Sequence, residues 1–242
     1  MPITFSERNI FKRSFKLGVV CALIATSLVI VTGHLYNQYL AYVQPMKMAA
    51  SEALWETAAP APFVVFAIID EDNQRNTYQI ELPAGLSVLA YNSLNTPVKG
   101  MNDLQAEYIG EYGPGYYIPA VTILFWSFRA MVAIGFWLVL LTTINYWYWW
   151  KKQIECCPTL LRTTIWSLPL PYLAIAMGWI ITEMGRQPWI VYGLLLTEKG
   201  VSKVVSAASV WTSLITYSLL YTCVALTAAY ATRKILHDGP GN

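Results

Sequence analysis

Two ionisable side chains, Arg129 and Glu183, stand within or at the end of long apolar segments of the sequence. Charge is costly inside a membrane, so such residues usually serve a ligand, an ion or a partner charge. Trp179, Glu183 and Arg186 fall at positions i, i+4 and i+7, which places them on one face of a helix. The alternative is a Glu183–Arg186 salt bridge at the membrane surface, which contributes little stability if water reaches it.

Met131 follows Arg129 two residues later, in the middle of the same apolar segment. A thioether can be an axial haem ligand that raises the reduction potential, although a methionine in an apolar helix more often serves packing. Two residues correspond to about 200° of rotation around a helix. Arg129 and Met131 are therefore expected to point in different directions, and the spacing leaves both interpretations of Met131 open.

Gln44, Lys47 and Glu52 form a third polar group, at the start of a long loop. An ammonium, a carboxylate and an amide at this spacing could hydrogen-bond the two oxygens of a small polar ring. Residues 46–57 consist largely of good helix formers. The alternative is therefore the solvated face of an amphipathic helix.

The composition indicates what kind of protein must position these groups. Of the 242 residues, 56% are hydrophobic and 12% are charged, whereas a soluble domain has about 25% charged residues. This excludes a disordered chain and a disulfide-rich secreted module, and a net charge of +2 does not favour nucleic acid as a partner. Four apolar segments, 15–37, 118–149, 160–184 and 203–232, reach the roughly 20 residues that cross a bilayer. We expect an all-α integral membrane protein with four transmembrane helices.

The positive charges predict the orientation, because Lys and Arg gather on the cytoplasmic side. They gather up to the start of the first segment, from the end of the second to the start of the third, and after the fourth: Arg8, Lys12, Arg13, Lys16, Lys151, Lys152, Arg162, Arg233 and Lys234. Residues 1–14, 150–159 and 233–242 are therefore expected in the cytoplasm, and the loops 38–117 and 185–202 outside. The first segment lacks a small-residue cleavage site and is interpreted as a retained span.

The loop 38–117 is expected to carry structure of its own. The predicted helix 46–57 ends before Pro60 and Pro62, and residues 63–69 and 77–82 read as two strands joined by a turn. Gly113-Pro114-Gly115 predicts a hinge before the second span, and the prolines 169 and 171 predict a kink in the third. The four cysteines and two histidines show no zinc-site spacing.

Three motifs resemble subunit I of the cytochrome bd quinol oxidases. The segment Gln44-Pro45-Met46-Lys47-Met48-Ala49-Ala50-Ser51-Glu52-Ala53-Leu54-Trp55-Glu56-Thr57 is similar to that family's quinol-loop motif. Phe128-Arg129-Ala130-Met131-Val132-Ala133-Ile134-Gly135 resembles a second motif, and Gly185-Arg186-Gln187-Pro188-Trp189, preceded by Trp179 and Glu183, resembles a third. The motifs occur in the family's order and extend over most of the chain.

The resemblance implies specific roles. Subunit I of that family holds haems b558, b595 and d and passes electrons from quinol to oxygen. By motif match, Met131 takes the place of a haem b558 ligand and Glu183 that of a haem b595 ligand. Gln44, Lys47 and Glu52 take the places of quinol-binding residues. Arg129, Trp179 and Arg186 take positions that line the haems or their propionates.

The resemblance covers only the C-terminal half of that subunit. His34 and His237 match none of the family's haem-ligand histidines, which lie in the other half together with the ligand of haem d. We therefore expect one piece of a split subunit I, or a truncated product, that works with the N-terminal half, with subunit II, and with quinol and oxygen in a bacterial or archaeal cytoplasmic membrane. The alternative is a haem- or quinone-binding remnant or assembly factor without oxidase activity of its own.

Overall fold

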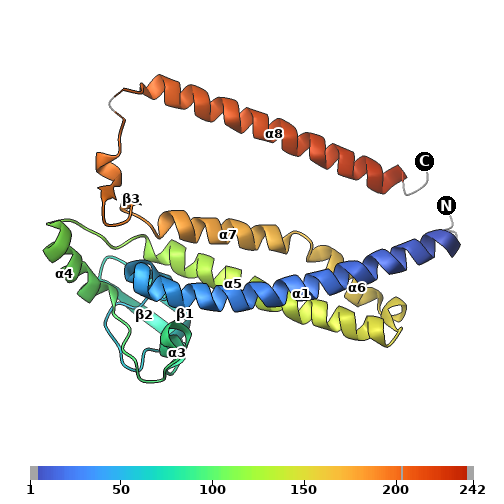
Figure 1. The fold of residues 1–242 in the computed structure, drawn as a ribbon, viewed down its shortest axis with the longest axis horizontal. Helices are drawn as coiled ribbons and strands as arrows, with labels where there is room; N and C mark the ends of the chain where they lie inside the picture. Colours follow the sequence, from blue (N-terminus) through green and yellow to red (C-terminus); the bar gives the residue numbers. More distant parts are fainter. Residues whose placement is uncertain (1–4, 203, 239–242) are drawn as a thin grey trace. The chain divides into compact units, whose positions relative to one another are not determined.

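The computed structural model describes residues 5–202 and 204–238, and most of them are helical (Figure 1). Four helical segments are long and apolar enough to cross a membrane: Asn9–Val43, Val121–Trp150, Pro158–Met184 and Ala207–His237. The prediction of a mostly helical protein with four candidate spans is therefore confirmed. No membrane is present, so the assignment of cytoplasmic and outer sides stays a prediction.

The chain divides into two units. The larger unit, Arg13–Glu198, contains most of the helix α1 (Phe5–Val43) and the helices α5 (Val121–Trp150), α6 (Pro158–Trp166) and α7 (Leu170–Met184). The helices α5 and α7 pack along each other. The smaller unit comprises Met1–Lys12 and Lys199–Asn242 and contains the helix α8 (Ala207–Asp238).

The third span is interrupted where the sequence predicts a kink. Helix α6 ends at Trp166 and α7 begins at Leu170, with Pro169 as its N-terminal cap. Pro171 follows at the second position of α7. A proline in the first turn of a helix has no amide hydrogen to lose from the hydrogen-bond ladder, so these residues allow a new helix to start and prevent one continuous helix.

The long loop, residues 44–120, is a folded region rather than a connection. It holds helix α2 (Pro45–Ser51), the antiparallel strands β1 (Phe63–Asp70) and β2 (Arg75–Leu82), and helices α3 (Gly85–Tyr91) and α4 (Met101–Tyr112). The predicted strands are confirmed, and the all-α class holds for the spans but not for this loop. A second, short sheet joins β3 (Trp189–Val191) and β4 (Leu195–Leu196), followed by a single turn of 3-10 helix at Thr197–Lys199.

Helix α2 is shorter than the predicted helix 46–57. Ala53 adopts a left-handed conformation with φ 51°, and the amide of Leu54 donates to the carbonyl of Ala49 at 3.0 Å. This pair of features is the Schellman motif that ends many helices. It turns the chain directly after Glu52, which leaves that carboxylate at the end of the helix.

Helix α4 was not predicted, although its pattern is readable. Met101, Leu104 and Tyr108 are its buried residues, at the i, i+3 and i+7 spacing of an amphipathic helix. These side chains join a buried cluster with Met46 of α2 and Phe125 of α5. The long loop is thereby packed onto the first turns of α5.

Candidate functional site

Helix α2, which carries the first part of the first motif, is buried from Met46 to Ser51. The exposed fraction of Lys47 is 6% and that of Glu52 is 1%. The solvated amphipathic helix considered from the sequence is therefore wrong. Burying a charge without a partner is very unfavourable, so the structure must provide one for each of these side chains.

Glu52 is paired with Arg129, which lies 77 residues later on α5. The Arg129 Nη2 atom lies 2.6 Å from Glu52 Oε2, and the two side chains are 9% and 2% exposed. The Arg129 Nε–H also donates to the backbone carbonyl of Val64 at 2.7 Å. The guanidinium carbon lies 4.3 Å from the ring centroid of Phe63 and 4.5 Å from that of Phe125. Arg129 thus joins α2, β1 and α5 at one point.

The pair is incompletely satisfied. Glu52 Oε1 and Arg129 Nη1 are buried and have no hydrogen-bond partner, and the same is true of Gln44 Oε1 at the start of α2. Most buried polar atoms in proteins do have a partner, so each exception needs an explanation. Burial raises the pKa of Glu52 to about 7, although the charge and the hydrogen bond of Arg129 oppose this shift.

The side chain of Lys47 packs against the third motif, at Gly185. A Cβ atom placed on Gly185 would lie 2.8 Å from Lys47 Cγ and 3.0 Å from Lys47 Cε. Burial lowers the pKa of Lys47, the charge of Arg186 lowers it further, and the charge of Glu183 acts in the opposite direction. The structure therefore brings Lys47 close to residues that are more than 130 positions away in the sequence.

Glu183 and Arg186 form the ion pair that their spacing allows, between Glu183 Oε2 and Arg186 Nη2. The pair is accessible, since the side chains are 52% and 38% exposed. Trp179, one turn earlier on α7, is 62% exposed. Trp179 and Glu183 lie on α7, whereas Arg186 follows the end of the helix, so the common helical face of all three residues stays a prediction.

Met131 lies on α5 where this helix faces α7. Its side chain is half-buried against the main cluster, and its sulfur lies 3.5 Å from where a Cβ would stand on Gly178. Within the described residues, no three His, Cys, Asp or Glu side chains gather as a metal site.

An aromatic group that the sequence analysis did not single out connects the loop after α7 to the long loop. Tyr108 of α4 and Tyr192 share a hydrogen bond between their hydroxyls. Trp189 stacks on Tyr117 with a centroid separation of 5.6 Å and contacts Tyr112 at 4.9 Å. Burial is the main cause that raises the pKa of Tyr108 well above its ordinary value. The amphipathic spacing of α4 was the available signal for Tyr108.

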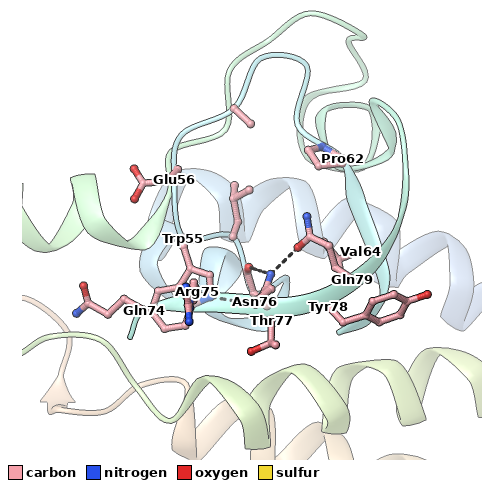
Figure 2. A pocket seen from close by; sticks show the side chains of 13 residues that line it. Trp55, Glu56, Pro62, Val64, Gln74, Arg75, Asn76, Thr77, Tyr78 and Gln79 are labelled. Atoms are coloured by element: carbon pink, nitrogen blue, oxygen red, sulfur yellow. Dashed lines mark hydrogen bonds between the residues drawn. The ribbon is translucent and has the colours of Figure 1, made fainter. Parts of the chain in front are cut away.

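A cavity of about 580 Å³ lies between the segment after α2 and the β1–β2 hairpin (Figure 2). Trp55 donates to Asn76 at 3.0 Å, and Asn76 donates to Gln79 at 2.7 Å and to the carbonyl of Ala53 at 3.0 Å. Ala53 and Val64 line the cavity, but their neighbours Glu52 and Arg129 do not. The cavity therefore lies next to the residues that hold the buried ion pair.

Comparison with known proteins identifies relatives over nearly the whole chain. The sequence profile of a family described as cytochrome bd terminal oxidase subunit I matches residues 3–240. The cytochrome bd ubiquinol oxidase subunit 1 of Bacillus subtilis (strain 168) is 44% identical over 216 residues, which cover 89% of this chain and 46% of that protein. The cytochrome bd-II ubiquinol oxidase subunit 1 of Escherichia coli (strain K12) is 31% identical, over 97% of this chain and 56% of that protein.

A solved structure, the bd oxidase from Geobacillus thermodenitrificans, matches with a TM-score of 0.79 and 30% identity, covering 98% of this chain and 52% of the other. The chain spans about half the length of the relatives it matches. The resemblance of the three motifs to subunit I of the cytochrome bd oxidases is thus confirmed by matches that extend over nearly the whole chain. On this evidence the chain belongs to the family of cytochrome bd terminal oxidase subunit I.

Proposed function

We propose that this chain is the part of a bd-type terminal quinol oxidase that carries the quinol-oxidation site and one ligand each for haems b558 and b595. The observation that carries the proposal is the buried Glu52–Arg129 pair with its unpaired atoms Oε1 and Nη1. A phenolic hydroxyl both donates and accepts hydrogen bonds. A quinol hydroxyl therefore offers both groups that these atoms lack: a donor for Glu52 Oε1 and an acceptor for Arg129 Nη1.

Glu52 is suited to take up a proton from that hydroxyl. Its pKa of about 7 is close to neutral pH, where a general base best combines the deprotonated form with the strength to accept a proton. Gln44 and Lys47 complete the quinol-binding part of the proposal. Gln44 supports it with a further unpaired buried acceptor, Oε1.

The proposed haem ligands fit the donors that the haems require. Met131 offers a half-buried thioether, which as an axial ligand favours the reduced iron. Glu183 offers an accessible carboxylate with Trp179 and Arg186 beside it, and an arginine can pair with haem propionates. The haems would supply the electron acceptor for quinol and the centre for oxygen reduction.

The role proposed for Arg129 includes the quinol site as well as haem lining. Its Nε and Nη2 atoms are bound to Val64 and Glu52, which leaves Nη1 to face a substrate hydroxyl or a haem propionate. Since Arg129 precedes Met131 by two residues on α5, it connects the proposed quinol site to the proposed b558 ligand.

The remaining parts of the oxidase are proposed as partners in the membrane. The chain corresponds to about half of subunit I, so the N-terminal half would supply the other ligands of haem b558 and the ligand of haem d. Subunit II and oxygen complete the proposed assembly. The bacterial relatives and the four candidate spans favour a bacterial cytoplasmic membrane.

Replacing Glu52 by Gln tests the proposal in the assembled oxidase. Loss of a general base typically costs about 10²–10⁴-fold, so quinol turnover should fall by that order while the haem spectra stay unchanged. With Glu52 present, turnover should rise as the pH rises through about 7, because the carboxylate must lose its proton before it can accept another. The variant should lack this rise.

Glu56→Gln is the matched control, since Glu56 is an exposed carboxylate four residues later that accepts from Asn102 at 2.7 Å. It should leave turnover unchanged. Normal quinol turnover in the Glu52→Gln oxidase would refute the assignment of the quinol site.

A further inference from the structure

Two motifs that are far apart in the sequence meet at Gly185. The aliphatic part of Lys47 crosses the backbone there so closely that a Cβ on Gly185 would lie 2.8 Å from Lys47 Cγ, a separation that real Cβ atoms do not tolerate. A glycine at this position therefore leaves room for the lysine stem. The first motif, on α2, therefore packs directly against the third motif, at the end of α7.

The contact also brings the Lys47 side chain beside the segment of the Glu183–Arg186 pair, because Gly185 lies between these two residues in the sequence. Arg186 already binds Glu183 directly, and the charges of both residues act on the Lys47 ammonium. Lys47 is 6% exposed, whereas Glu183 and Arg186 are accessible. Because Lys47 is buried, its interaction with these residues is screened less by salt than one between two exposed charges.

We infer that Lys47 is a positioning residue for the Glu183–Arg186 pair: held against Gly185, its cation contributes to the positive field at the carboxylate of Glu183. The inference rests on the proposed role of Glu183 as a ligand of haem b595. It gives Lys47 a second task beside quinol binding, and it joins helix α2 of the quinol loop to the haem ligand on α7 by one side chain.

The test is the midpoint potential of the high-spin haem in the complete oxidase. Lys47→Met keeps the aliphatic stem and removes the charge. Loss of a nearby cation stabilises the oxidised, more positive iron, so the potential should fall while haem content stays normal. Lys47→Arg should restore the potential, because it returns the charge. Lys99→Met is the matched control: Lys99 is an exposed lysine of the same loop, bound to Glu107 at 2.7 Å, and its loss should not shift the potential.

The contact itself is tested with Gly185→Ala in two backgrounds. With Lys47 present, the new methyl group meets the lysine stem and the carbonyl of Ile181, which lies 2.5 Å from its position. With Lys47→Ala the stem is gone and only the carbonyl contact remains. The shift in potential caused by Gly185→Ala should therefore be smaller in the second background, and the difference measures the coupling of the two residues.

An unchanged potential in Lys47→Met, together with impaired quinol oxidation, would overturn the inference and leave Lys47 to the quinol alone. Equal shifts for Gly185→Ala in both backgrounds would also overturn it. Neither result affects the proposed haem ligands. The proposed role of Glu183 as a haem ligand would be refuted by a different result, namely a full content of high-spin haem in a Glu183→Gln oxidase.

Discussion

At the scale of single residues, the site is defined by which atoms remain without a partner. Arg129 is fixed by two hydrogen bonds and by the faces of Phe63 and Phe125, yet Nη1 is left over together with Glu52 Oε1. A buried pair of this kind gains little stability over apolar residues of equal size. The pair is therefore better explained by a role in binding, through its two unpaired atoms, than by a role in stability.

Met131→Leu separates packing from ligation at this scale. The substitution conserves volume, so its effect on the free energy of unfolding should be below about 1.5 kcal/mol. If the sulfur is an axial ligand, the low-spin b558 band of the assembled oxidase should nevertheless change and its reduction potential should fall. Optical redox titration gives both quantities. A wild-type band and potential would return Met131 to packing alone.

At the scale of elements, the long loop is positioned by close contacts between backbones. Helix α4 begins after Gly100, where a Cβ would lie 2.3 Å from the carbonyl carbon of Glu56 and 2.5 Å from the carbonyl oxygen of Trp55. The amide of Met101 donates to Leu54 at 2.9 Å, and that of Asn102 donates to Trp55 at 3.0 Å. The start of α4 is thereby held against the segment that follows Glu52.

Gly100→Ala should loosen this arrangement. Backbone atoms have to move to admit the methyl group, which typically costs about 1–3 kcal/mol, and the long loop should become more sensitive to protease. Gly110→Ala is the control on the same helix, because its Cβ would meet nothing within 4 Å. An alanine inside a helix is favoured over glycine by about 0.5–1 kcal/mol. Equal protease resistance in the two variants would contradict the proposed docking of α4.

At the scale of the whole molecule, the proposed haem ligands lie on different helices of the larger unit. Met131 is on α5 and Glu183 is at the end of α7. The two helices pack together, so one chain can present both donors while each site keeps its own surroundings. The long loop rests on the same pair through Arg129 and Lys47.

Glu183→Gln tests this separation in the assembled oxidase. A neutral amide binds iron poorly, so if Glu183 is the proposed ligand, the high-spin b595 signal should be lost or shifted. Haem b558 should persist because its proposed ligand, Met131, is on α5. If the exposed ion pair with Arg186 is all that Glu183 provides, the variant costs about 1 kcal/mol or less and haem content stays complete. Haem extraction and the high-spin signal distinguish the two outcomes.

The sequence by itself determined the features that depend on neighbours along the chain. Four spans follow from the length of the apolar segments, and the β1–β2 hairpin and the break at Pro169 follow from local turn and proline chemistry. The Glu183–Arg186 pair follows from helical spacing. The family resemblance was carried by three short motifs, because their residue types and order are visible without a fold.

Only the tertiary structure decided which residues, distant in the sequence, contact the buried charged side chains. The sequence groups Lys47 with Glu52 in one polar cluster, but in the fold Glu52 pairs with Arg129 and Lys47 packs against Gly185. These choices depend on how α2 packs against α5 and α7. Such packing is set by burial and by long-range contacts, and a pattern of residue types along the chain does not specify which distant charge a buried side chain will meet.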